Sequence, residues 1–357
     1  MTIKANGYAA LSSASSLEFF SFERREPRSQ DVVIDILYCG VCHSDIHTVR
    51  NEWKWSSTIY PSVPGHEIIG RVSAIGDMVR KYNVGDLVGV GCIVDSCRHC
   101  ASCDDGLEQY CDNGFTATYN SEDKIGGTLH NTTFGGYSSV IIVDEQFVLR
   151  IPENLDPAAA APLLCAGITV YSPLKHWKVG AHQKIGIIGL GGLGHMGVKF
   201  AHAMGAEVVM ITTSPQKGED AKKLGADDVL LSTDMKAMAA AQNSFDLLLN
   251  TIPVGHDVDP YMALLKRDAT MVILGAVEPL KRVDGTPFIF RRRHMAGSLI
   301  GGIAETQEML DFCGKHQITC DIEKIDIQTI NQAYDRTVKG DIKYRFVIDM
   351  ASLKTKL

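Results

Sequence analysis

A glycine pattern in the middle of the chain constrains the fold more than any other feature. Its G-x-G-x-x-G spacing covers residues 189–194, directly after the apolar stretch 184–188 and before a helix-like stretch at 193–204. In that position a pyrophosphate can sit at the helix N-terminus, with the backbone approaching it closely. A chain with 33 glycines can produce the pattern by chance, so the prediction of a dinucleotide-binding unit depends on the strand and the helix around it.

The chain has different textures on the two sides of residue 152. Before it, strand-like runs punctuated by glycine are expected at 32–38, 68–75, 87–90 and 137–143. After it, expected strands at 184–188, 207–212, 228–231, 245–250 and 270–274 alternate with helices, including 217–224 and 261–265, as in an α/β doubly wound parallel sheet. A further strand at 344–350 needs a partner outside that sheet. We therefore predict domains of 1–152 with 302–357 and of 153–301.

Composition and charge limit the class of function. The 357 residues suffice for two domains, each with its own core. Acidic residues outnumber basic ones by 42 to 35, and the net charge of −7 argues against a nucleic-acid or anionic-membrane partner. No apolar run reaches the roughly 20 residues of a membrane helix, and a secretory h-region of about 7 to 15 apolar residues is missing. We expect a cytoplasmic enzyme that acts on a small molecule.

Four closely spaced cysteines predict a structural zinc site. Their spacing, C-x2-C-x2-C-x7-C, lets four thiolates surround one tetrahedral Zn²⁺, and they are Cys97, Cys100, Cys103 and Cys111. Disulfides conflict with a cytosolic context, and iron–sulfur clusters usually show other spacings. Because four protein ligands leave no open position, this metal would hold a loop and do no chemistry.

A second set of possible zinc ligands is scattered along the chain. Cys42 forms a C-x-x-C pair with Cys39, His66 precedes Glu67, and Cys165 lies far downstream. Two thiolates and one imidazole leave a fourth zinc position free for water or substrate, as Lewis-acid catalysis requires. Taken singly, these residues are better explained as a redox pair, a core histidine and an inert buried thiol. Their joint presence with the four-cysteine loop and the glycine pattern favours a catalytic zinc.

The end of the second strand indicates the cofactor. An NAD site would place an acidic residue there, about 20 residues after the glycine pattern, to bind the ribose 2′-hydroxyl. The sequence instead has three hydroxyl side chains and a lysine, at Thr212, Thr213, Ser214 and Lys217. Hydroxyl donors and a cation suit a dianionic 2′-phosphate, which favours NADP(H) over NAD(H). The alternative is a plain turn before a helix that starts near the lysine.

Together these motifs resemble the zinc-dependent medium-chain alcohol dehydrogenases, and most closely their cinnamyl-alcohol-dehydrogenase branch with its bacterial aldehyde reductases. The resemblance covers nearly the whole chain and rests on motifs in the family's order, at 40–45, 65–67, 97–111, 165–169 and 189–194, with branch-like segments at 90–97 and 339–349. It implies a GroES-like catalytic domain formed by both ends of the chain, a Rossmann domain between them, and a homodimer.

The resemblance also assigns roles to individual residues. It implies that Cys42, His66 and Cys165 bind the catalytic zinc, with Glu67 as an occasional ligand. Asp45 would orient His66 through a hydrogen bond. The roles of hydroxyl relay and of proton carrier to solvent, by way of the cofactor ribose, fall to Ser44 and His47. The implied cofactor contacts are Thr169, Gly189, Leu190, Gly191, Gly192, Leu193, Gly194, Thr212, Thr213, Ser214, Lys217, Thr251, Gly275, Ser298 and Ile300.

The substrate pocket is less well defined by the sequence. Candidates that would line it are large apolar or thiol side chains, each of which is equally consistent with ordinary packing: Trp53, Trp55, Cys92, Phe115, Val277, Leu299 and Ile300. The preferred aldehyde, whether cinnamyl, benzyl or aliphatic, therefore stays open. For Cys313 and Cys320 we expect only buried packing.

These observations predict a zinc-dependent, NADP(H)-dependent interconversion of aldehydes and primary alcohols, with two zinc ions per chain. One alternative is an NAD-dependent dehydrogenase of secondary alcohols or polyols with the same fold, against which the missing acidic residue argues. The other is a non-enzymatic NADPH-binding zinc protein, which the intact ligand set makes a poor explanation. A zinc-free quinone reductase of the same superfamily would not need these ligands.

Overall fold

The computed structural model describes residues 2–275, 278–281 and 283–356, which form two compact units. The first unit consists of the chain up to Cys165 together with the residues from Gly301 onward, and the second consists of 166–300. The predicted domain limits stay a proposal, which differs from these units mainly in the assignment of residues 153–165.

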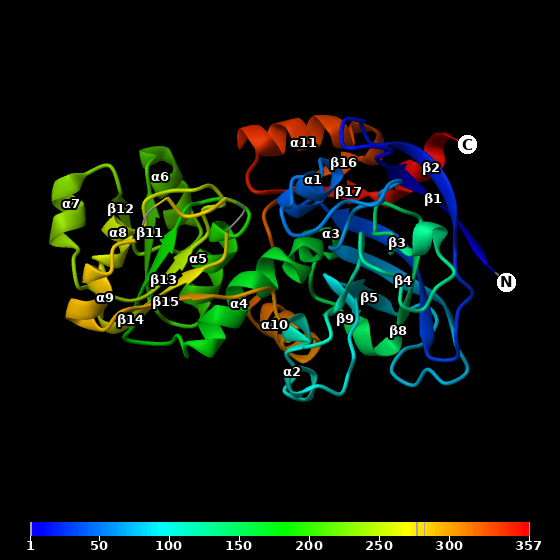
Figure 1. The fold of residues 1–357 in the computed structure, drawn as a ribbon, viewed down its shortest axis with the longest axis horizontal. Helices are drawn as coiled ribbons and strands as arrows, with labels where there is room; N and C mark the ends of the chain where they lie inside the picture. Colours follow the sequence, from blue (N-terminus) through cyan, green and yellow to red (C-terminus); the bar gives the residue numbers. More distant parts are fainter. Residues whose placement is uncertain (1, 276–277, 282, 357) are drawn as a thin grey trace. The chain divides into compact units, whose positions relative to one another are not determined.

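A mostly antiparallel sheet organises the first unit. Its strands run in the order β16-β17-β3-β4-β5-β9, and β8 also pairs with β3. Figure 1 shows the C-terminal strand β17 inside this sheet, where it pairs antiparallel with β3. The C-terminal segment thus returns to the N-terminal sheet. The sheet strands are β3 (Asp31–Gly40), β4 (Ile68–Ile75), β5 (Leu87–Val90), β8 (Val140–Asp144), β9 (Leu149–Arg150), β16 (Ile322–Asp326) and β17 (Arg345–Asp349).

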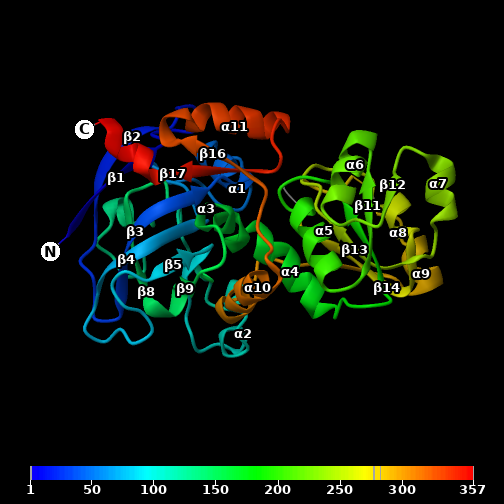
Figure 2. The same ribbon diagram turned by 180° about the vertical axis from the view of Figure 1, so that it is seen from behind.

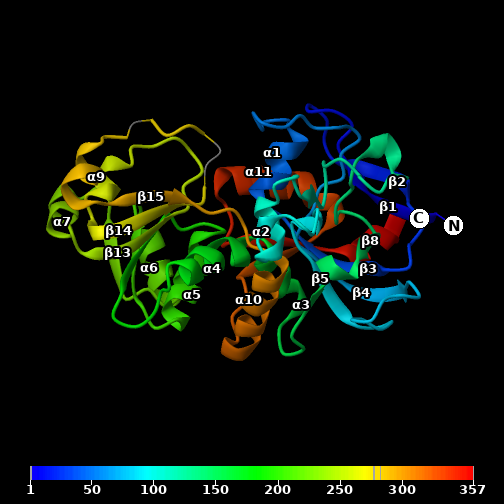
Figure 3. The same ribbon diagram turned by 60° about the horizontal axis from the view of Figure 1, so that its bottom comes forward.

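Short elements complete the first unit. Two small antiparallel pairs are β1 (Ile3–Ala9) with β2 (Glu18–Arg24) and β6 (Ile93–Asp95) with β7 (Thr116–Ala117). The α-helices are α1 (His43–Val49), α2 (Ala101–Asp104), α3 (Pro157–Ala160), α10 (Ile303–His316) and α11 (Ile330–Lys339). Helices α1 and α11 lie side by side (Figure 3). Short 3₁₀ helices occupy 108–110, 129–131, 145–147, 161–164, 327–329 and 350–356.

The second unit contains a six-stranded parallel sheet in the order β12-β11-β10-β13-β14-β15. This is the strand order of a Rossmann fold, as predicted. The strands are β10 (Lys184–Ile188), β11 (Glu207–Thr212), β12 (Asp228–Leu231), β13 (Phe245–Asn250), β14 (Leu265–Ile273) and β15 (His294–Gly297). The helices are α4 (Ala166–His176), α5 (Gly194–Ala203), α6 (Pro215–Lys223), α7 (Met235–Ala240), α8 (Asp259–Met262) and α9 (Thr286–Arg291). Figure 2 shows α5 and α6 beside β11, with which both are in contact.

Several boundaries differ from the sequence-based expectation, and for α8 and β8 the cause is local. The helix expected at 261–265 is α8, which begins two residues earlier because Pro260 sets the backbone angle of a first helical turn. Its expected last residue, Leu265, already belongs to β14. The strand expected at 137–143 begins only at Val140, since Gly135, Gly136 and Tyr137 hydrogen-bond instead to the segment 63–65.

Buried apolar side chains fill both units. In β3 the run 31–34 is buried and every residue of β8 is, so these strands are covered on both faces. The second unit has a core cluster around Phe245, Leu248 and Met271. Cys313 and Cys320 are buried, as expected. Among the described residues no single helix is long and apolar enough to span a bilayer, and one bent pair, 157–164 with 166–176, meets that test by length and composition only.

Candidate metal centres and cofactor site

The first unit brings the scattered ligands together. Cys42, His66, Glu67 and Cys165 each offer one ligand atom, and these four atoms lie within 4.8 Å of one another. The Sγ atoms of Cys42 and Cys165 are 4.0 Å apart. All four residues are buried, and each lies at the edge of an element: before α1, before β4, or after the 3₁₀ helix 161–164. A compact set of two thiols, an imidazole and a carboxylate is a donor set that suits zinc.

Asp45 fixes the orientation of His66. Its Oδ1 lies 3.2 Å from His66 Nδ1, which leaves Nε2 for a metal. The carboxylate also accepts hydrogen bonds from the backbone N–H groups of Cys42, at 2.8 Å, and Gly65, at 3.1 Å. Asp45 is fully buried, so these donors replace the water that its charge has lost. This contact is the one that the family resemblance implies for Asp45.

The two carboxylate oxygens of Glu67 have different surroundings. One of its oxygens, Oε1, pairs with the buried guanidinium of Arg345 from β17. Within the described part of the chain the other oxygen, Oε2, is buried without a hydrogen-bond partner. Burial raises the pKa of Glu67 to about 7, although the charge of Arg345 opposes this. An orphaned buried oxygen beside two thiols and an imidazole fits an occasional metal ligand.

The two ligand thiols are electrostatically different. The hydrogen bond from Cys165 and the charge of Arg345 hold the pKa of Cys42 well below its ordinary value, despite burial. The same hydrogen bond raises the pKa of Cys165. One thiolate is therefore favoured before any metal binds, and metal binding would displace the second proton. The Cys42, His66, Glu67 and Cys165 group fits a zinc ion on these grounds.

Helix α1 places Ser44 and His47 one turn apart, so both side chains lie on one face. Both are half-buried. His47 Nδ1 lies 2.5 Å from Glu52 Oε2, an arrangement in which Nδ1 donates its hydrogen to the carboxylate. No sequence signal singled out Glu52, because a glutamate in an exposed loop is usually solvated.

The loop with the four cysteines also brings its ligand atoms together. Cys97, Cys100, Cys103 and Cys111 bring their sulfurs within 4.8 Å of one another. A backbone hydrogen bond at His99, together with the Asn113 side chain, lowers the pKa of Cys97 to about 5, which favours the thiolate that zinc binds. Arg98, inside the loop, bonds to Asp95 and to Asp144 at the end of β8. Four thiols and no open position fit a structural zinc.

The glycine pattern lines a cavity of about 320 Å³ in the second unit. A Cβ at Gly194 would lie 2.0 Å from the Gly189 carbonyl oxygen, so only glycine lets α5 start this close to β10. A Cβ at Gly191 would meet nothing within 4 Å, which leaves its backbone open to a ligand. Gly192 and Leu193 form the turn before α5, and Leu190 lines the cavity. Thr251, also in the lining, donates to the carbonyls of Ile188 and Gly189.

The end of β11 forms the polar part of this cavity. Thr212, Thr213, Ser214 and Lys217 all line it, and Lys217 is the only charged residue in the lining that the structure describes. Ser214 also caps α6 by accepting a hydrogen bond from the Lys217 N–H. A cavity with a lysine, hydroxyls and a helix N-terminus fits a phosphorylated ribose. Sequence reasoning missed Ser232, which follows β12, and Tyr261 of α8, which line the same cavity.

The remaining predicted cofactor contacts lie outside the lining of this cavity. Thr169 is buried in α4, and Gly275 follows β14. Ser298, Leu299 and Ile300 follow β15, and Leu299 is exposed. The cofactor contacts at these positions stay predictions.

The pocket candidates are equally scattered. Cys92 lies beside the metal ligands, since its Sγ contacts the Leu164 carbonyl at 3.8 Å. Trp53 packs against His47, whereas Trp55 is mostly exposed. Phe115 is half-buried, and Val277 lies outside the described residues.

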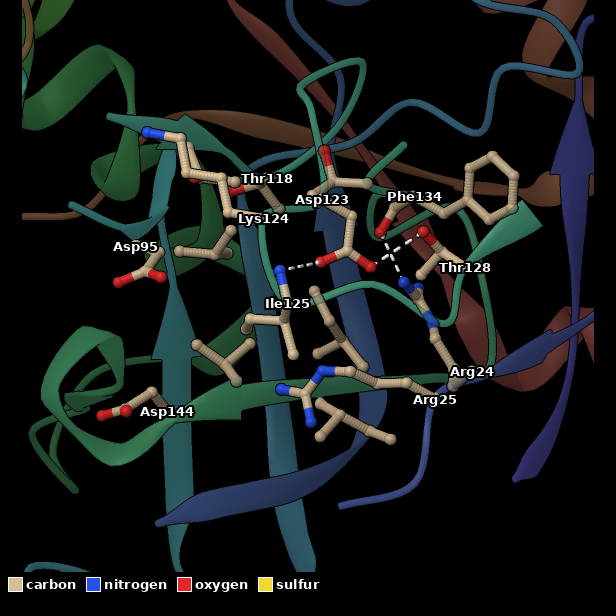
Figure 4. A pocket seen from close by; sticks show the side chains of 16 residues that line it. Arg24, Arg25, Asp95, Thr118, Asp123, Lys124, Ile125, Thr128, Phe134 and Asp144 are labelled. Atoms are coloured by element: carbon tan, nitrogen blue, oxygen red, sulfur yellow. Dashed lines mark hydrogen bonds between the residues drawn. The ribbon is translucent and has the colours of Figure 1, made fainter. Parts of the chain in front are cut away.

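A smaller cavity of about 50 Å³ lies elsewhere in the first unit (Figure 4). Its polar side chains mostly bond within the protein. Asp123 accepts from the Ile125 N–H and the Thr128 hydroxyl, and Arg24 donates to the Phe134 carbonyl. The buried Thr116 hydroxyl, which also lines it, has no hydrogen-bond partner among the described residues. This cavity contains none of the metal ligands.

The geometry of both units agrees with comparisons to known proteins. Residues 28–153 match the alcohol dehydrogenase GroES-like domain, and residues 192–315 match the zinc-binding dehydrogenase family. The chain belongs to the zinc-dependent medium-chain alcohol dehydrogenases.

Individual relatives place it in the cinnamyl-alcohol-dehydrogenase branch of that family. The chain is 57% identical to the aldehyde reductase YahK of Escherichia coli over 99% of both chains. A cinnamyl alcohol dehydrogenase from Sorghum bicolor superposes with a TM-score of 0.94 at 43% identity, covering 99% of this chain and 100% of that one. A cinnamyl alcohol dehydrogenase from Helicobacter pylori, solved with NADP(H), gives 0.91 at 40% identity over 98% and 99%.

Proposed function

We propose that this protein is a zinc-dependent oxidoreductase that interconverts aldehydes and primary alcohols with NADP(H). The observation that carries the proposal is the convergence of Cys42, His66 and Cys165, buried and within ligand distance of one another. The names of its relatives, an aldehyde reductase and two cinnamyl alcohol dehydrogenases, support the substrate class. The cavity beside Lys217 supports the phosphorylated cofactor.

The chain would hold a zinc through Cys42, His66 and Cys165, and a second through the four-cysteine loop. When bound at the first site, zinc supplies a Lewis acid that polarises a carbonyl, and NADP(H) supplies or accepts the hydride. Glu67 offers a fourth ligand, and the ion pair with Arg345 compensates its negative charge. The buried ligand set keeps bulk water from these donors and so strengthens their electrostatic effect.

Ser44 and His47 would manage the proton of the alcohol. A hydroxyl both donates and accepts, so Ser44 Oγ can give a proton to the product oxygen and be resupplied. Glu52 holds His47 Nδ1, which fixes the tautomer with Nε2 free to accept a proton. His47 is partly exposed, and it can therefore exchange that proton with solvent.

We propose the remaining roles on the same basis. The predicted cofactor contacts would bind NADP(H), and Trp53, Trp55, Cys92, Phe115, Leu299 and Ile300 would contribute to the substrate pocket. Six of the cysteines gather in two groups that suit metal ions rather than disulfides, which supports a reducing cytoplasmic location. Strand β15 lies at one edge of its sheet, and Ile289 and Phe290 in the preceding helix are strongly exposed. These features support a homodimer.

The first experiment measures NADPH oxidation by the zinc-loaded protein with cinnamaldehyde, benzaldehyde and a short aliphatic aldehyde, in parallel with NADH. We expect rapid turnover with NADPH. The double variant Lys217→Glu with Thr213→Asp should lower the NADPH-to-NADH ratio of kcat/KM by roughly ten-fold or more, since it removes a charge-assisted contact and adds repulsion.

The control for the lysine is Lys222→Glu, which makes the same lysine-to-glutamate change on α6 outside the cavity lining. It should leave the ratio unchanged. Turnover with NADH alone would contradict the cofactor assignment and favour the NAD-dependent alternative. Absence of turnover with either cofactor over the aldehyde panel would contradict the enzymatic function.

A further inference from the structure

A pair of buried tyrosine hydroxyls lies behind the metal ligands of the first unit. Tyr137 is fully buried, and its hydroxyl donates to Asp45 Oδ2 at 3.3 Å. Tyr334 is also buried and donates to the Tyr137 hydroxyl at 3.5 Å. Neither residue is a metal ligand, and the proposed chemistry uses neither hydroxyl.

The contacts form one chain of donors that ends at the histidine ligand. Tyr334 donates to Tyr137, Tyr137 donates to Asp45, and Asp45 faces His66 Nδ1 at 3.2 Å. Three distant segments contribute: helix α11, the segment before β8, and helix α1. Figure 3 shows α11 beside α1, so the C-terminal helix packs where this donor chain begins.

Backbone pairing fixes Tyr137 independently of its hydroxyl. Its N–H bonds to the Pro64 carbonyl at 3.0 Å, and its own carbonyl accepts from the Tyr8 N–H at 2.9 Å. Its ring packs so closely on Gly65 that a Cβ there would lie 2.7 Å from the ring. Gly65 also has a φ of +105°, a conformation that favours glycine. The residue before His66 is therefore shaped around the Tyr137 ring.

Asp45 needs each of its donors because it is a buried carboxylate. It has two backbone N–H donors, from Cys42 and Gly65, both of which belong to the ligand-bearing segments. Tyr137 is the side chain that holds Oδ2 from a separate part of the chain. Loss of this hydroxyl leaves the carboxylate freer to turn, and the His66 ring would turn with it.

We propose that Tyr137 is a positioning residue for the catalytic zinc: its hydroxyl holds Asp45, Asp45 orients His66, and Tyr334 holds Tyr137 in turn. This inference rests on the proposed function, because it assigns a role toward the same metal site. It predicts that the hydroxyl affects metal affinity at that site and not at the four-cysteine loop.

The test is zinc retention by the full chain against a graded chelator, with zinc per chain as the readout. The Cys42→Ser variant identifies which step of zinc loss belongs to the catalytic site. We expect Tyr137→Phe, which keeps the ring and the backbone contacts, to weaken that step by roughly ten-fold, the lower end of effects from residues that orient metal ligands. The Co²⁺ spectrum of the substituted catalytic site should change with it.

Tyr82→Phe is the matched control. Tyr82 is a buried tyrosine of the same unit whose hydroxyl donates to the Val148 carbonyl at 2.5 Å, with no contact to Asp45. Its loss should lower thermal stability without moving the catalytic zinc step. Tyr334→Phe should weaken the step by less than Tyr137→Phe, and by nothing further when Tyr137 is already phenylalanine, since it acts through that hydroxyl.

Two results would overturn the inference. In the first, Tyr137→Phe retains catalytic zinc within two-fold of wild type and only loses stability, as Tyr82→Phe does. In the second, Tyr334→Phe weakens zinc binding as much in the Tyr137→Phe background as in wild type. A wild-type protein that binds a single zinc, or that reduces no aldehyde, would instead overturn the proposed function.

Discussion

The two metal centres of the first unit are built in opposite ways. The four-cysteine site draws all its ligands from one loop, and three of the four cysteines are half-exposed. The other site draws its ligands from three separated segments, and all of them are buried. The dispersed site also contains or adjoins three buried charged side chains, Asp45, Glu67 and Arg345. The ligands of the four-cysteine site are thiols alone.

This difference shows how far the spacing of the ligands along the chain determines each site. Ligands with only two or seven residues between them meet because a short loop can turn only in a few ways. Ligands about a hundred residues apart meet only after β3, β4 and β17 have paired. A loop site can therefore stabilise its own segment, whereas the dispersed site depends on the folded sheet and is free to leave a coordination position open.

The largest effect should come from Cys42→Ser. We expect kcat/KM to fall roughly a thousand-fold or more, because the Lewis acid is lost while the sheet that holds the site stays folded. Turnover, circular dichroism and zinc content measure this, with zinc falling by one ion per chain. The control is Cys313→Ser, a buried cysteine outside both clusters, which should retain zinc and rate. Wild-type turnover in Cys42→Ser would refute the zinc role.

Cys100→Ser should show the opposite pattern. Loss of the structural metal frees the loop, so we expect the thermal unfolding midpoint to drop by roughly 10 °C or more, while the folded fraction keeps most of its turnover. Differential scanning calorimetry with zinc analysis checks this. An unchanged melting profile with full zinc content would show that the four-cysteine site is not structural.

Arg345→Met tests how much the buried ion pair at the dispersed metal site contributes to the free energy of unfolding. The change leaves the buried Glu67 charge uncompensated, and breaking one partner of a buried pair costs about 3–5 kcal/mol. Chemical denaturation should show this loss, and the added change Glu67→Gln should restore part of it. As a control, Arg292→Met removes an exposed arginine paired with Asp268 and should cost much less. Equal losses would contradict this role of burial.

The smallest effect concerns pH and the support of the cysteine loop. Arg98 of that loop bonds to Asp144, which Arg28 approaches at 3.9 Å, and Arg28 also pairs with Asp31. Burial raises the pKa of Asp31, but hydrogen bonds from the Arg25 and Arg28 side chains and the Arg28 N–H outweigh this and hold it below 3.8.

Because its folded pKa is depressed, Asp31 stabilises the fold fully above about pH 4 and loses this contribution as the pH falls through the folded pKa. We expect Asp31→Asn to be less stable at neutral pH and to flatten the acid limb of the stability curve. Urea unfolding between pH 3 and 7 measures both. An acid limb as steep as that of wild type would contradict the assignment.

The sequence predicted the second unit better than the first. The strands 184–188, 207–212, 228–231 and 245–250 are found with the predicted bounds, because apolar runs between turn residues define buried parallel strands. The edge strand β15 was not predicted, since its four residues follow a basic run and have no continuous apolar pattern. The hairpin β1–β2 also lacked a strong signal.

The sequence by itself determined the chemistry of each site. Cysteine spacing, the glycine pattern and the missing carboxylate after β11 are local features, and short-range geometry follows from the covalent chain. The tertiary structure alone decided which distant groups meet. Arg345 reaches Glu67 only because β17 returns to β3, and Tyr137 reaches Asp45 only because its segment pairs with 63–65. Such contacts depend on strand pairing across long separations, which no local pattern encodes.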